Sequence, residues 1–171
     1  MRQLVSVFVD IAFHRKGPDA VPASGFLFGL VLLAYGALSL PIWILNWPLQ
    51  QALGIMALDI MLHLMFFGIV LTIAQRSNRF LQTITAALGA ETFLGCFALP
   101  LHLTIVSGDR ADAPALAATF LLLLILFWSI DIAGFVLSRA LDRPYIVGVV
   151  IMIGYVLGSM TLGEFLFPSP R

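Results

Sequence analysis

The chain has 171 residues, of which 61% are hydrophobic and 11% are charged, and its mean hydropathy is +1.05. Soluble domains carry about 25% charged residues, so this chain has too few polar side chains to cover a soluble surface. Its formal net charge is zero, which gives no reason to expect a nucleic-acid partner. The composition therefore predicts an integral membrane protein.

The first predicted element is a short helix before the long apolar segments. Leu4, Val7, Phe8 and Ile11 recur at helical spacing, with polar residues at other positions. The sequence RKGPDAVP then ends the pattern, because glycine and proline do not continue a helix. The apolar run is too short to span a bilayer. We predict that residues 1–24 form an amphipathic helix at the cytoplasmic interface, which either anchors the topology or docks a cytosolic partner.

Five long apolar segments follow, and each exceeds the roughly 20 residues that a helix needs to cross a bilayer. Short breaks of turn-forming and charged residues separate them, and none is long enough to hold a soluble domain. We therefore predict a single membrane domain over residues 1–171, an all-α, polytopic transmembrane helix bundle with five spans. The predicted spans cover residues 25–47, 49–75, 80–106, 114–138 and 145–167.

The distribution of Arg and Lys sets the expected orientation. Seven of these residues lie in the N-terminal segment and in the breaks after the second and fourth spans, whereas Arg110 and Arg171 lie on the opposite side. Cytoplasmic loops are enriched in Arg and Lys. We therefore predict that the N-terminus is in the cytoplasm and the C-terminus outside, with Trp43 and Trp47 at the outer interface.

Four ionisable residues lie inside the predicted spans: Asp59 and His63 in the second, Glu91 in the third and Asp131 in the fourth. Such residues are costly in lipid and are expected to face the bundle interior. At about 1.5 Å per residue, His63 and Glu91 lie about 20 and 18 Å from the cytoplasmic arginines, and Asp131 about 12 Å. Because a tight turn joins the second and third spans, we predict that His63 and Glu91 are neighbours, with Asp59 on the same interior face.

Three interpretations of this candidate intramembrane polar cluster remain open. The four residues satisfy one another and fix helix register, or they form a proton relay or substrate site, or the histidine and two carboxylates bind a metal. The sequence contains no H-E-x-x-H, G-x-S-x-G, Walker or Rossmann motif. We therefore expect no catalytic residue, no cofactor and no metal.

Small residues recur four positions apart in two spans, at Gly25 and Gly29 and at Gly154 and Gly158. In apolar helices this G-x-x-x-G pattern allows two helices to approach closely. We predict close packing through both faces, within the chain, with a membrane-protein partner or between copies in a homo-oligomer. The lipid bilayer is the other expected partner.

Two stretches carry a family resemblance. LQTITAALGAETFLGCFALPL has a glycine-containing first half and a late Leu-Pro pair, and FWSIDIAGFVLSRALDRPYIVGVVIMIGY is a tryptophan-bearing span followed by a basic turn. With the five spans and the amphipathic start, they make the chain resemble the Yip family, the Ypt/Rab-interacting five-span membrane proteins, and its bacterial Yip-like members in particular. For eukaryotic members the resemblance implies membrane trafficking and GTPase partners. No functional residue carries over, because neither stretch holds a catalytic motif.

We expect a non-enzymatic protein of a bacterial inner membrane, acting as a membrane scaffold or accessory subunit through helix and lipid contacts. The alternative is a small transporter or proton-coupled permease component that uses the four intramembrane ionisable residues. A continuous polar cavity that reaches one membrane face would favour the transporter. A dry, fully paired cluster would favour the scaffold.

Overall fold

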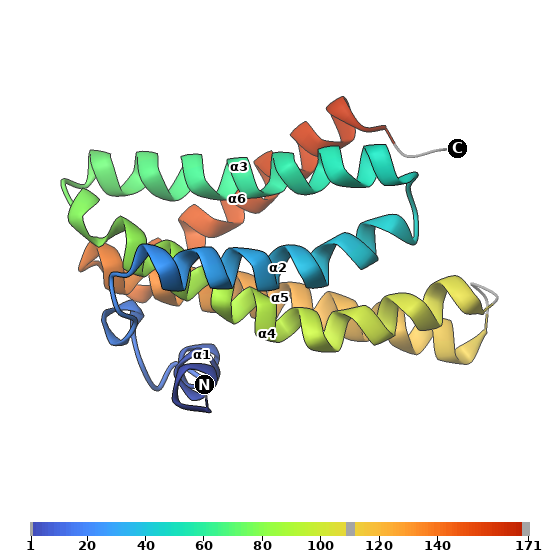
Figure 1. Cartoon of the computed structure of the whole chain (residues 1–171), viewed down its shortest axis with the longest axis horizontal. Helices are drawn as coiled ribbons and strands as arrows, with labels where there is room; N and C mark the ends of the chain where they lie inside the picture. The colour runs from blue at the N-terminus through green and yellow to red at the C-terminus, as the bar shows by residue number, and fades with distance from the viewer. Residues whose placement is uncertain (1, 109–111, 169–171) are drawn as a thin grey trace.

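The computed structural model describes residues 2–108 and 112–168, and these residues form helices and turns without a strand. Helices α2 to α6 are each long and apolar enough to cross a membrane, which confirms the predicted all-α bundle (Figure 1). The α-helices are α1 (Arg2–Ala12), α2 (Gly25–Ile44), α3 (Leu49–Ile73), α4 (Phe80–Ser107), α5 (Ala113–Leu141) and α6 (Tyr145–Leu166), with short 3-10 helices η1 (Pro18–Ala20) and η2 (Ser77–Arg79).

The ends of the helices follow from local chemistry. The hydroxyl of Ser24 accepts a hydrogen bond from the backbone N–H of Leu27 (3.3 Å) and caps the start of α2. Pro48 and Pro144 stand directly before α3 and α6, where a missing N–H costs nothing. Helix α5 runs three residues further than predicted and ends at Leu141, and the next residue, Asp142, takes up a left-handed conformation with φ 52°.

Helix α4 lies at the centre of the bundle and packs against α1, α2, α3 and α5. All eight residues from Thr83 to Ala90 are buried. The two threonines among them donate hydrogen bonds to carbonyl groups of their own helix, Thr83 to Arg79 (2.8 Å) and Thr85 to Leu81 (2.6 Å). These bonds satisfy the hydroxyl groups without a partner helix, so this buried stretch of α4 needs no polar contact from another helix.

Two glycines bring the backbones of α5 and α6 close together. A Cβ on Gly134 would lie 2.8 Å from the Cα of Val149, and a Cβ on Gly148 would lie 2.9 Å from the Cβ of Ser138. Each glycine therefore allows the opposite backbone to approach closely. From this contact α6 runs obliquely across the bundle towards the other end of α3 (Figure 1).

The predicted packing through the two G-x-x-x-G faces within this chain is wrong. A Cβ on Gly25, Gly29, Gly154 or Gly158 would meet no atom of another helix within 4 Å. Both α2 and α6 are apolar all round, so the glycine pattern alone does not decide which face of the helix turns inward. These two faces are left open on the outside of the described bundle.

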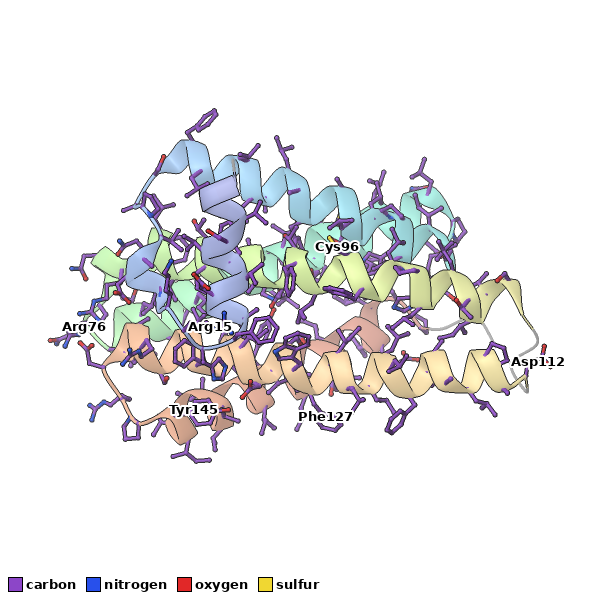
Figure 2. All side chains as sticks on the ribbon, turned by 90° about the horizontal axis from the view of Figure 1, so that it is seen from below. Arg15, Arg76, Cys96, Asp112, Phe127 and Tyr145 are labelled. Atoms are coloured by element: carbon purple, nitrogen blue, oxygen red, sulfur yellow. The ribbon has the colours of Figure 1, made fainter. Side chains whose placement is uncertain are left out.

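Helix α1 runs crosswise to the spans and lies against α4 and α5 (Figure 2). Ile11 and Ala12 are buried on its inner face. The indole N–H of Trp128 in α5 donates a hydrogen bond to the carbonyl of Ala12 (3.1 Å), and the Gln82 side chain of α4 donates one to the carbonyl of Val21 (3.0 Å). The N-terminal helix is therefore attached to the bundle, and its place at a membrane interface stays a prediction.

Basic residues gather at one end of the bundle, which Figure 2 shows at Arg76, opposite Asp112. Arg76 and Arg79 form ion pairs with Asp142 (2.9 and 3.0 Å), and so join the α3–α4 turn to the α5–α6 turn. The hydrogen bond from Arg79 lowers the pKa of the exposed Asp142 carboxyl. Arg110 and Arg171 lie outside the described residues, and the N-in, C-out orientation stays a prediction.

Candidate functional site

Three helices bring together the polar side chains of the bundle interior. The two nitrogens of the His63 ring lie 3.4 Å from a carboxylate oxygen of Asp59 and 3.3 Å from one of Glu91. The hydroxyl of Tyr35, in α2, donates a hydrogen bond to the Asp59 carboxylate. The predicted contact between His63 and Glu91 is thus confirmed. We call Tyr35, Asp59, His63 and Glu91 the cavity cluster.

The contacts of His63 define where protons sit in this cluster. Its Nδ1 lies 2.9 Å from the backbone carbonyl of Asp59, and a carbonyl only accepts, so Nδ1 carries a hydrogen. Its Nε2 faces Glu91. The 3.3 Å contact is favourable only with a hydrogen between the two atoms, carried either by Nε2 or by the Glu91 carboxyl. The geometry therefore suits a proton shared between His63 and Glu91.

The geometry does not suit a metal ion. His63 directs its two ring nitrogens to different carboxylates, whereas a metal centre needs its ligand atoms directed at one point. No group of three or more His, Cys, Asp or Glu side chains in the described ranges is arranged to hold a metal. The arrangement instead resembles a chain, from the Asp59 carboxylate through the imidazole to the Glu91 carboxylate.

The cluster borders a cavity of about 540 Å³ that extends to one end of the bundle. His63, Glu91 and Met152 lie at its inner end, and Trp47 and Phe167, which follow the ends of α2 and α6, lie at the other. Most of the wall is apolar, with a few polar groups converging at the inner end. Size and lining are those of a small-molecule site.

Tyr155 of α6 adds a polar group to the cavity wall. Its ring lies 5.2 Å from the His63 ring in an edge-on arrangement. Its hydroxyl is buried and has no hydrogen-bond partner among the residues that the structure describes. A buried hydroxyl without a partner is costly, so this atom is a ready contact for a bound molecule.

A second cavity of about 240 Å³ lies on the α2 side of the cluster. Asp59, Glu91, Trp43 and Ser129 line both cavities. The two carboxylates therefore stand between the two spaces. A molecule or a water chain that passed from one cavity to the other would cross the wall that the two carboxylates share with Trp43 and Ser129.

Asp131 does not join this cluster, so the interpretation in which all four residues satisfy one another is wrong at this position. α5 turns Ser129 and Ala133 towards the larger cavity, and Asp131 projects from another side of the helix. The Asp131 carboxylate lies 3.1 Å from Nε2 of His14, without the alignment of a hydrogen bond, and accepts one from Tyr145. We call His14, Asp131 and Tyr145 the flank cluster.

The positions of the tyrosines offered a signal that sequence reasoning missed. The chain has three tyrosines, and each lies at one of the two clusters: Tyr35 against Asp59, Tyr155 against His63 and Tyr145 against Asp131. Tyrosine is common at membrane interfaces, which made these residues unremarkable in the sequence. The depth of Tyr35 and Tyr155 within their spans was the available clue, whereas Tyr145 begins α6 and offered none.

No protein-family model, curated protein or solved structure matches the chain. The resemblance to the Yip family therefore stays a prediction. Fold and composition define the class, an all-helical integral membrane protein with five apolar helices that can span a bilayer.

Proposed function

We propose that the protein is a small transporter or permease component, which admits a small amphipathic molecule to the cavity and couples its entry to the proton shared by His63 and Glu91. The observation that supports this is the continuity of the 540 Å³ cavity from the cavity cluster to the bundle end at Trp47 and Phe167. A dry, closed cluster would have favoured a purely structural role. In the predicted orientation this opening faces the outside of a bacterial inner membrane.

The chemistry of the cluster fits proton coupling. Intramembrane Asp, Glu and His chains mark proton and substrate pathways. His63 is buried, with a side chain only 8% exposed, and Glu91 is 19% exposed at the cavity. A solute that binds beside Glu91 changes the surroundings of the shared proton, and a change in protonation alters the charge that the solute meets. The proposed role needs no catalytic residue, and we propose a non-enzymatic protein.

Proton flux in liposomes tests this function. Purified protein is reconstituted with a pH-sensitive dye inside, and three aromatic amphiphiles are added in turn: cationic ethidium, neutral phenylnaphthylamine and anionic anilinonaphthalene sulfonate. At least one should change the internal pH faster than in protein-free liposomes. Glu91→Gln should abolish that flux, and Asp131→Asn, which removes an intramembrane carboxylate outside the cavity, should retain it. Absence of flux with all three solutes would contradict the proposal.

The open glycine faces support a second candidate function, a membrane scaffold or accessory subunit. Gly25, Gly29, Gly154 and Gly158 have no atom of this chain near their missing side chains, and such faces suit a partner helix or a second copy. Gly154→Leu should then dissociate an oligomer in detergent or lipid without changing the flux. If the wild type and Gly154→Leu are both monomers, the scaffold role is contradicted.

A further inference from the structure

The charges that face the larger cavity have one dominant sign. At its inner end, Asp59 and Glu91 bring two carboxylates to its wall, and His63 brings one imidazole. None of the described residues that line the cavity is Arg or Lys. With all three groups ionised the inner end carries one net negative charge. Since charge in a low-dielectric site attracts its opposite strongly, the cavity favours a cation over a neutral or anionic solute.

Aromatic rings cover the cavity between the carboxylates and its mouth. Trp43, Trp47, Tyr155 and Phe167 come from α2, the turn after it, α6 and the residue after α6. Their faces carry partial negative charge and attract cations, while their edges pack against apolar groups. A solute with an apolar body and a positive charge would contact both kinds of wall at once.

We infer that the cavity binds a lipophilic monocation, with its charged group beside Glu91 and Asp59 and its apolar body against the aromatic rings. This inference rests on the proposed function, since it names the solute class of the same cavity. The cation and the proton shared by His63 and Glu91 compete for one carboxylate, so binding of the cation releases a proton. Such exchange would link entry of the solute to proton movement.

A pair of ions with the same shape and opposite charge tests the inference directly. Tetraphenylphosphonium and tetraphenylborate are titrated separately onto the purified full-length protein in micelles, with protein-free micelles as the blank, and tryptophan fluorescence reports binding. The phosphonium should bind at least about tenfold more tightly, a difference within reach of one close charge pair. Equal or tighter binding of the borate would overturn the inference.

Variants locate the bound cation. Glu91→Gln should weaken phosphonium binding at least about tenfold, Glu91→Asp should restore most of it, and Asp131→Asn should leave it within about twofold, since only the first removes a charge from the cavity. If Glu91→Gln does not fold, Asp59→Asn takes its place as the variant that removes a charge from the cavity. Its binding is then compared with that of Glu91→Asp and Asp131→Asn. Equal loss in Asp131→Asn and Glu91→Gln would show binding elsewhere and overturn the inference.

The pH dependence provides an independent readout. The titratable groups that face Glu91 are Asp59 and His63 from α3, Tyr35 from α2 and Tyr155 from α6, and α5 contributes only uncharged residues to this cavity wall. Phosphonium affinity should therefore fall as pH falls, by up to about tenfold per pH unit when one proton is exchanged. A pH-independent affinity would overturn the exchange.

Failure of this inference can be distinguished from failure of the proposed function. If phosphonium binds in micelles and no solute moves protons in liposomes, the solute class stands and the transport role falls. If the neutral or the anionic amphiphile drives proton flux and phosphonium does not bind, the transport role stands and the solute class falls.

Discussion

The cavity cluster and the flank cluster contain the same chemical groups in different surroundings. Each combines an imidazole, a carboxylate and a tyrosine hydroxyl. The side chain of His63 is 8% exposed and borders a cavity, whereas those of His14 and Asp131 are 32% and 39% exposed. The flank cluster joins the segment after α1 to α5 and α6. The two clusters therefore differ in burial and in the cavity beside one of them, and this difference supports the proposal made for the cavity cluster.

Cross-linking should separate the two clusters most sharply. In a Cys96-free protein, cysteines in place of His63 and Glu91 should be joined almost completely by a short bis-methanethiosulfonate reagent, because the tips of the native side chains are in contact. Cysteines in place of His63 and Asp131 should not cross-link. The Arg76→Cys, Asp142→Cys pair is the positive control, since those side chains form an ion pair. A failed 63–91 cross-link beside a successful control would contradict the geometry of the cavity cluster.

Thiol labelling should distinguish the surroundings of the two clusters about tenfold. Ser129→Cys lines the cavity, so a cationic methanethiosulfonate should react with it about tenfold faster than an anionic one, because clefts lined by one charge concentrate its opposite. Asp131→Cys should show no such preference. In whole cells, labelling of Ser129→Cys from outside also tests the predicted orientation. Equal rates for both reagents at Ser129→Cys would contradict a negatively charged cavity.

The flank cluster should hold the N-terminal helix. His14→Ala removes the contact with Asp131 and should weaken the docking of α1 by at most about 1 kcal/mol, as for other partly exposed ion pairs. Amide hydrogen exchange in α1 should then be up to about fivefold faster. Glu91→Gln is the matched control and should leave α1 unchanged. Unchanged hydrogen exchange in His14→Ala would show that Trp128 and the apolar face of α1 suffice to hold α1 against the bundle.

Glu91→Gln should cost little stability. The amide can still contact His63, and polar contacts between membrane helices contribute on average about 0.6 kcal/mol. Unfolding in mixed micelles, followed by tryptophan fluorescence, measures the difference. A loss of about 3 kcal/mol, typical of a broken buried charge pair, would indicate that the cluster mainly stabilises the fold.

Asp142 carries an exposed carboxylate outside both clusters, and its replacement should give the smallest effect. Its pKa is lowered by the hydrogen bond from Arg79 and by the charges of Arg79 and Arg76. The ion pairs therefore stabilise the fold above the unfolded pKa, about 3.9, and this contribution is lost as pH falls through the lowered pKa of the folded state. The difference in unfolding temperature between wild type and Asp142→Asn should shrink below about pH 4. A difference in unfolding temperature that does not change with pH would contradict stabilisation by the ion pairs of Asp142.

The helices themselves were predictable because length and hydropathy decide them. A segment of more than about 20 apolar residues has to be helical to satisfy its backbone in lipid. Turn-forming and charged residues mark the breaks, and α2 to α6 begin within one residue of the predicted positions. The contact between His63 and Glu91 was also predictable, because a tight turn and a constant rise per residue place them at one depth.

Tertiary structure alone decided which face of each spanning helix turns inward. In a soluble helix the apolar stripe reveals the buried face, and this worked for α1, where Ile11 is buried. The spans are apolar on every side, so small differences in packing set their rotation. That rotation moved Asp131 to the flank, placed Gly25 and Gly154 on the outside, and opened a cavity beside Glu91. A cavity forms where oblique helices leave space between them, and no local pattern of residues specifies that space.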